Sequence, residues 1–242
     1  MRGFKCCREV LWDPGAAPPP DLGVEIVKVV SFTSGVVISL FPMDEFAPLV
    51  RLNERQLLDE IGKRYSFGLI PDMRVSRAEL GKTGLVFESG AHNTPDGTVT
   101  IVSVSIHNDG VIVRAATTKQ AERFVGDLKE WLIAERGFRR VSTTSLYLSE
   151  LVVDFERPLS STFKNFETIS NLVTNKVAEH REVTLSALAG FAIEFVGAAS
   201  PPRFSIERRV GASFGQERYF CSAPLRTEAH VEVLRELEQQ CL

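Results

Sequence analysis

The sequence predicts an α+β fold made of two tandem β-α-β-β-β-α units, with an antiparallel sheet and with the helices packed on one face. Two observations favour this fold. A hydrophobic pattern recurs after about 109 residues. In addition, segments with strand-like and helix-like patterns follow the same order in both halves of the chain. Because residue identity between the halves is low, the repeat is one of pattern alone.

The repeated pattern is that of an amphipathic helix that begins at a threonine. In the first half, the inward positions after Thr118 are Ala121, Phe124, Val125, Leu128 and Leu132. In the second half, the positions after Thr227 are His230, Val233, Leu234, Leu237 and Cys241. Spacings of three, four and seven residues place such side chains on one helix face. A shorter helix upstream repeats as well, with Leu58, Ile61 and Tyr65 matched by Phe166, Ile169 and Val173.

The chain divides into a tail, which its composition indicates, and two units, which the repeated order of elements indicates. We expect the two units to pack together as one globular body. Residues 1–22 contain a run rich in proline and alanine, which favours an extended, disordered tail. The first unit is expected over residues 23–141 and the second over residues 142–242.

The elements of the first unit follow from β-branched runs, turn residues and helix caps. A hairpin is predicted for Val24–Phe32 and Gly35–Phe41, because the residues between them suit a turn. Asn53 with Gln56 resembles a capping box, so a helix should run to about Tyr65. Three strands and a helix that stops at Gly137 should follow. The strands are expected at Leu85–Ser89, Thr98–Ile106 and Val111–Ala116.

The second unit repeats this order with different turn residues. Its first strand is expected at Leu146–Phe155, and Ser160 or Ser161 should cap a helix that runs to about Val177. Pro224 ends the strand region, and Thr227 opens the final helix. The strands between these helices are expected at Gly190–Val196, Phe204–Val210 and Arg218–Ser222.

This duplicated order of elements resembles the topology of TATA-binding-protein-like folds and of helix-grip folds. In such a unit the helices cover one face of the sheet, and the other face is left to solvent, to the second unit or to a partner. The resemblance is one of topology and includes no motif residues, so it implies no activity.

Composition is that of a globular protein with a sizeable core: 44% of the residues are hydrophobic and 24% are charged. The net charge of −3 argues against a broad nucleic-acid footprint, although a local basic face is compatible with it. No apolar run approaches the roughly 18 residues of a membrane span. The four cysteines form no CxxC pair, so we expect a reducing, cytoplasmic location.

Local motifs indicate neither a cofactor nor a metal. Gly81-Lys82-Thr83 resembles the end of a phosphate-binding loop, but it lacks the preceding glycine and the helix that should follow. The four histidines have no metal-ligand spacing. His230 falls on an inward helical stripe, so we expect a core or boundary histidine. No Gly-x-Ser-x-Gly elbow is present, and the sequence therefore yields no catalytic residue.

Charged side chains alternate with apolar ones on the strands of the second unit. If these strands pair, a polar sheet face carries Glu150, Asp154, Glu194, Glu207 and Arg209, with Arg208 beside it. Cross-strand ion pairs on a solvated face are the favoured interpretation. Two others stay open: acid–base catalysis by the carboxylates, and binding of a ligand or nucleic acid in which Arg208 and Arg209 contact phosphates.

The predicted strand Thr98–Ile106 is apolar on both faces, with Val99 and Ile101 on one side and Val102, Val104 and Ile106 on the other. Such a strand needs cover on both sides, from the second unit or from another chain. We therefore expect a non-enzymatic interaction or assembly subunit of a cytoplasmic complex, which associates with a protein partner or with itself.

Overall fold

The computed structural model of the protein describes residues 27–42, 44–49, 53–71, 84–163, 165–180, 188–196, 202–213 and 215–240. The predicted tail at residues 1–22 and the Gly81-Lys82-Thr83 segment therefore lie outside the described residues. Within these ranges the chain forms one eight-stranded antiparallel sheet with four α-helices, so the predicted α+β class is confirmed.

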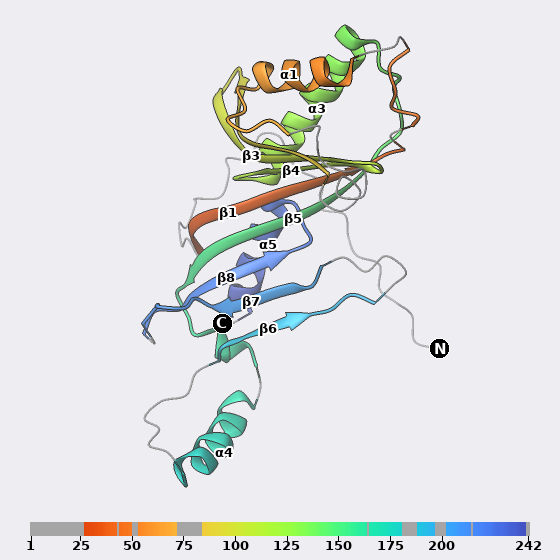
Figure 1. Ribbon diagram of the computed structural model, residues 1–242. Helices are drawn as coiled ribbons and strands as arrows, with labels where there is room; N and C mark the ends of the chain where they lie inside the picture. The colour runs from red at the N-terminus through yellow and green to blue at the C-terminus, as the bar shows by residue number, and fades with distance from the viewer. Residues whose placement is uncertain are drawn as a thin grey trace, which may run out of the picture.

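The strands pair in the order β2-β3-β4-β1-β5-β8-β7-β6, so β1 and β5 lie side by side at the centre (Figure 1). The strands are β1 (Val27–Leu40), β2 (Leu85–Thr94), β3 (Gly97–His107), β4 (Gly110–Ala115), β5 (Thr144–Phe155), β6 (Gly190–Ile193), β7 (Phe204–Arg208) and β8 (Arg218–Ala223). The helices are α1 (Glu54–Arg64), α3 (Thr118–Arg136), α4 (Phe166–Ala178), α5 (Thr227–Gln239) and the 3₁₀ turn η1 (Leu159–Thr162).

The strand β1 is continuous and does not form the predicted hairpin. It pairs with β5 from Val27, opposite Phe155, to Leu40, opposite Thr144, with two register shifts on the way. Gly35 does not make a turn, because the start of α3 crosses β1 at this position. A Cβ on Gly35 would lie 2.2 Å from backbone atoms of α3 and of its cap. The glycine thus permits a close approach of two backbones.

The helices α3 and α5 begin next to each other over the central strands. The N–H of Thr118 donates to Oγ1 of Thr227 at 3.0 Å, and the N–H of Thr227 donates to Oγ1 of Thr118 at 2.8 Å. The two helices begin at the predicted threonines, but neither threonine is the capping residue of its own helix. Thr117 caps α3 in a capping box with Gln120, and Arg226 precedes α5. Each threonine instead satisfies a free N–H at the start of the other helix.

Two hydrophobic cores lie between the helices and one face of the sheet. The first core is covered by α1 and α3, and its largest fully buried side chains are Ile61, Tyr65, Phe87, Ile101 and Phe124. The second core is smaller and is covered by α5; its largest apolar side chains are Leu151, Leu159, Ile206, Tyr219 and Leu234. Helix α4 contributes no buried residue to either core.

Strand β3 does not have the two apolar faces that the sequence predicts. A register shift just after Ile101 moves the alternation of side chains by one residue. Ile101 and Val104 are therefore both fully buried in the first core, and Val99 and Ile106 pack against it. Val102 lies at the bulge and is 50% exposed. The strand needs no second covering layer, so this pattern no longer supports an interaction role.

Other boundaries differ from the predictions for local reasons. Strand β2 continues beyond its predicted end at Ser89 to Thr94 and then reverses in a tight turn to β3. Strand β6 ends at Ile193 and is shorter than predicted. Neither predicted serine caps α4, because both serines lie in η1. Helix α4 begins after Asn165, which has a left-handed φ of 70° and no side-chain cap.

Candidate functional site

Three of the predicted site residues lie on the sheet face that the helices leave open. Glu150 and Asp154 are on β5 and Glu207 is on β7, while their strand neighbours Leu151 and Ile206 point into the second core. Asp154 is four positions after Glu150 on the same strand, a distance of about 13 Å. Glu207 lies two strands from β5, about 10 Å away. The strand geometry therefore spreads these carboxylates over the face and does not gather them.

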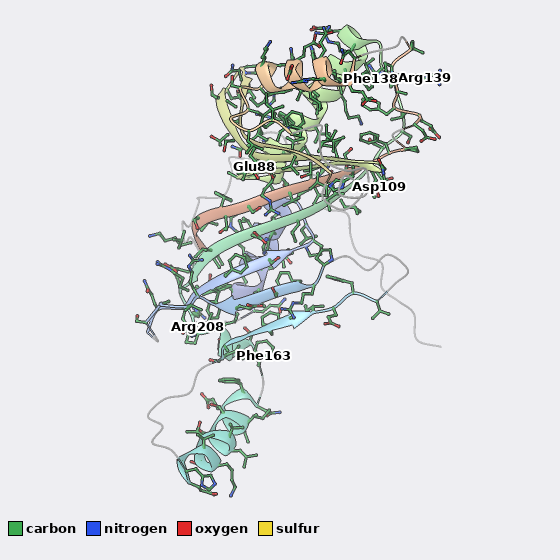
Figure 2. All side chains as sticks on the ribbon, in the orientation of Figure 1. Glu88, Asp109, Phe138, Arg139, Phe163 and Arg208 are labelled. Atoms are coloured by element: carbon green, nitrogen blue, oxygen red, sulfur yellow. The ribbon has the colours of Figure 1, made fainter. Side chains whose placement is uncertain are left out.

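The other three predicted residues lie at strand ends. Glu194 follows the last residue of β6, and Arg209 follows the last residue of β7; both are exposed. Arg208 is the last residue of β7 and lies on the helix side of the sheet. Its guanidinium is 3.0 Å from a carboxylate oxygen of Glu217 and 3.0 Å from the hydroxyl oxygen of Tyr219. Figure 2 shows Arg208 at the outer end of the sheet.

Arginines pair with two of the carboxylates on the open face. Nε and Nη2 of Arg218 donate to the two oxygens of Asp154 at 2.6 and 2.7 Å. These hydrogen bonds lower the pKa of Asp154 below its usual range. Arg203 lies 3.4 Å from a carboxylate oxygen of Glu207. Ionised carboxylates that hold arginines are typical of a solvated, ion-paired surface.

A serine and a histidine lie within hydrogen-bonding distance in the interior. Oγ of Ser149 is 2.8 Å from Nδ1 of His230, and both residues are fully buried. Burial lowers the pKa of His230 to about 4, so its ring is neutral near pH 7. A catalytic serine needs contact with a substrate, which burial denies to this pair. The pair joins β5 to α5, and the expectation of a core histidine is confirmed.

Helix α4 carries an apolar stripe that no described part of the chain covers. Ile169, Leu172, Val173 and Val177 recur at helical spacing on one side of the helix and are 60, 63, 54 and 39% exposed. We call these four residues the α4 stripe. Helix α4 packs against η1 and projects away from the sheet (Figure 1). A contiguous exposed apolar surface of this kind is typical of an interaction site.

Positions matched by the predicted repeat differ in burial between the two halves. Tyr65, which directly follows α1, is 2% exposed, and its ring packs against Phe124 of α3 with the ring centroids 4.6 Å apart. The positions matched to this pair are Val173 on α4 and Val233 on α5. Both are exposed, Val233 by 37%. The second half therefore exposes both sides of a contact that the first half buries.

The same difference is found on the sheet. Phe87 on β2 is fully buried, whereas the matched residue Ile193 on β6 is 50% exposed. The match rests on two glycines with positive φ values: Gly84, which precedes β2, has a φ of 71°, and Gly190, the first residue of β6, has a φ of 148°. A Cβ at either glycine would lie 2.7 or 2.0 Å from a carbonyl oxygen of the neighbouring strand. We call Ile193 and Val233 the receiving surface.

The start of α4 is attached to the outer edge of the sheet. Leu159 of η1 is fully buried in the second core. The ring of Phe163 packs against Phe191 of β6 with centroids 5.2 Å apart, and the N–H of Phe166 donates to the carbonyl oxygen of Phe163 at 3.1 Å. Figure 2 shows Phe163 where the chain leaves the sheet for α4. These contacts direct the helix away from α5.

The described part of the chain contains no group of three or more His, Cys, Asp or Glu side chains placed to hold a metal ion. It also contains no helix long and apolar enough to cross a membrane. Comparison with models of known protein families and with curated proteins found no match.

Sequence reasoning missed the α4 stripe as a surface, because its spacing predicted a helix packed like α1. The apolar positions at and after the end of α1 have the same periodicity as those on α4: Leu58, Ile61 and Tyr65 in the first half, and Phe166, Ile169 and Val173 in the second. Periodicity reports which side of a helix is apolar and not what lies against it. No signal in the sequence distinguishes the two cases.

Proposed function

We propose that the protein is an interaction or assembly subunit that self-associates by exchanging α4 between two copies of the chain. The observation that carries the proposal is the joint exposure of the α4 stripe and of the receiving surface on β6 and α5. In such an exchange, the stripe of each copy covers the receiving surface of the other. This is the helix-in-groove mode of recognition, in which apolar residues at helical spacing act as anchors.

We further infer that the chain consists of two tandem β-α-β-β-β-α units. Three observations support this inference. The element order repeats with η1 and α4 in the place of α1. The strand order is mirrored about the central pair of β1 and β5. Thr118 and Thr227, at matched positions, exchange hydrogen bonds between the starts of α3 and α5. In this arrangement α4 corresponds to α1, and the receiving surface corresponds to the positions beneath α1.

A second copy is the occupant that suits the geometry. Docking α4 on its own chain would require the helix to turn back, which breaks the hydrogen bond between Phe166 and Phe163 and moves Phe163 from Phe191. Exchange between copies leaves these contacts in place. Because each copy carries both the stripe and the receiving surface, one two-fold axis satisfies both contacts, as in a closed isologous dimer.

Size-exclusion chromatography with light scattering tests the proposal on the full chain over a range of protein concentrations. Leu172→Glu places a carboxylate in the centre of the stripe, and an unpaired charge is strongly disfavoured in a buried interface. Asn171→Glu is the matched control, because this exposed residue lies on the opposite side of α4. We expect dimers for the unmodified chain and for Asn171→Glu, and monomers for Leu172→Glu. A monomeric unmodified chain, or variants that behave alike, contradicts the proposal.

Disulfide trapping tests which surfaces meet. One preparation carries Val173→Cys and another carries Val233→Cys, both in a background in which Cys6, Cys7 and Cys241 are serine. Val173 and Val233 match the residues that pack together between α1 and α3. We expect a mixed disulfide dimer when the two preparations are combined under oxidising conditions.

The matched control moves the α4 cysteine to position 171, as Asn171→Cys, and should give no mixed dimer with Val233→Cys. A single chain that carries both Val173→Cys and Val233→Cys separates the two modes of docking. Cross-linked dimers support exchange between copies. Cross-links confined to monomers mean that α4 docks on its own chain, and this result overturns the proposal.

A further inference from the structure

The first core contains a cavity of about 330 Å³ between α1, α3 and the sheet. Protein interiors are close-packed and have few voids larger than a water molecule, so a cavity of this size is a distinct feature. Its volume falls in the range of small-molecule sites. The walls are mainly aromatic and aliphatic, and include Phe41, Phe46, Leu58, Ile61, Leu128 and Phe138.

Among the described residues, two charged side chains line the cavity, Glu54 and Lys129. Glu54 lies in the first turn of α1 and is exposed to solvent. Lys129 is half-buried in the middle of α3. Its ammonium nitrogen is 3.2 Å from Oγ1 of Thr143 and 5.4 Å from the ring centroid of Phe41. The cavity wall therefore has one partly desolvated positive charge beside an aromatic ring.

The neighbouring acidic residue, Glu130, forms its ion pair with Arg140 and not with Lys129. Glu130 accepts hydrogen bonds from both terminal nitrogens of Arg140, at 2.8 and 2.9 Å. No ion pair between described residues includes Lys129. Burial lowers the pKa of Lys129; the charge of Glu130 opposes this shift, and that of Arg140 adds to it. A carboxylate on the ligand would supply the charge partner that the described residues do not, through a charge-assisted hydrogen bond.

We propose that this cavity binds an apolar carboxylate of the fatty-acid class, with the acyl chain among the aromatic and aliphatic walls and the carboxylate on Lys129. The volume sets the size of the ligand. If a methylene group occupies about as much space as a water molecule in the liquid, about 30 Å³, the cavity holds a chain of roughly ten carbons. The site belongs to the first core, whereas the α4 stripe and the receiving surface belong to the second half of the chain.

Isothermal titration calorimetry of the full chain with decanoate and with decan-1-ol tests the proposal. Decan-1-ol has the same chain length but no charge. Lys129→Gln removes the ammonium and should weaken the binding of decanoate about tenfold while leaving decan-1-ol unaffected. Lys119→Gln, an exposed lysine of the same helix, is the control and should change neither. Leu57→Trp, at a half-buried lining residue, fills the cavity and should weaken both ligands at least tenfold.

The results that overturn the proposal are equally specific. The first is the absence of any heat of binding for decanoate. The second is an unchanged preference for decanoate over decan-1-ol in Lys129→Gln. The third is an unchanged affinity for both ligands in a folded Leu57→Trp variant. Thermal melts of each variant establish that it is folded. Leu172→Glu should bind decanoate like the unmodified chain, because the cavity does not depend on self-association. A loss of affinity in Leu172→Glu would place the ligand on α4 and contradict the proposal.

Discussion

Replacing Thr118 with valine should destabilise the fold by about 2–4 kcal/mol, because valine keeps the shape but removes the hydroxyl group. The hydroxyl accepts from the N–H of Thr227 at 2.8 Å and donates to Oγ1 of Thr227 at 3.1 Å. The two residues are 0 and 3% exposed, so water cannot replace the lost partner. A buried N–H without an acceptor costs about 1–3 kcal/mol, and a lost neutral hydrogen bond adds about 1 kcal/mol.

Urea unfolding followed by circular dichroism measures this free energy for Thr118→Val, Thr227→Val and the double variant. Each single variant leaves one N–H without its acceptor, and both lose the same hydroxyl–hydroxyl bond. The double variant should therefore cost about 1 kcal/mol less than the sum of the single variants. Thr100→Val, at an exposed position on β3, should stay within about 0.5 kcal/mol of the unmodified chain. Single effects below about 0.5 kcal/mol, or strict additivity, would refute the reasoning.

Three further predictions concern stability, and the same urea assay measures each of them. Gly35→Ala should cost about 3 kcal/mol or more, because its Cβ would meet backbone 2.2 Å away, whereas Gly126→Ala in open space on α3 should stabilise the fold by about 0.5–1 kcal/mol. Equal effects would contradict this. The pKa of His230 is lowered to about 4 by burial, so the unfolded chain gains a proton below about pH 6.5 that the folded chain does not. The unmodified chain should therefore lose about 2 kcal/mol more than His230→Gln between pH 7 and pH 5, and parallel pH profiles would argue against a neutral buried ring. Asp154→Asn removes a half-exposed pair with Arg218 and should cost no more than about 1 kcal/mol; a larger loss would show a structural role.

Most elements could be predicted from the chain because their signals are local. The capping pair at Asn53 and Gln56 and the left-handed residue Gly137 after α3 act over a few residues. The errors arose where a distant segment decides the outcome. Glycine is typical of turns, but Gly35 lies within a strand because the backbone at the start of α3 crosses closely there. The bulge after Ile101 depends on pairing with β4.

The candidate sites show the same division. Alternation placed Glu150, Asp154 and Glu207 on one face, because side chains on a strand alternate whatever surrounds it. The distances between these carboxylates follow from the strand order, which the chain does not state locally. The cavity beside Lys129 is lined from α1, α3, the sheet and two connecting segments, so no spacing along the sequence could reveal it.

Apart from the first strand, the order of strands and helices was determined by the sequence alone, as was the apolar side of each helix, since both follow from local conformational preference and periodicity. Which apolar sides are covered was decided only by the tertiary structure. Ile61 on α1 and Ile169 on α4 have the same pattern, yet they are 2 and 60% exposed. The reason is physical. Burial depends on where residues far along the chain, or in another chain, come to lie, and the periodicity of a helix contains no information about the position of those residues.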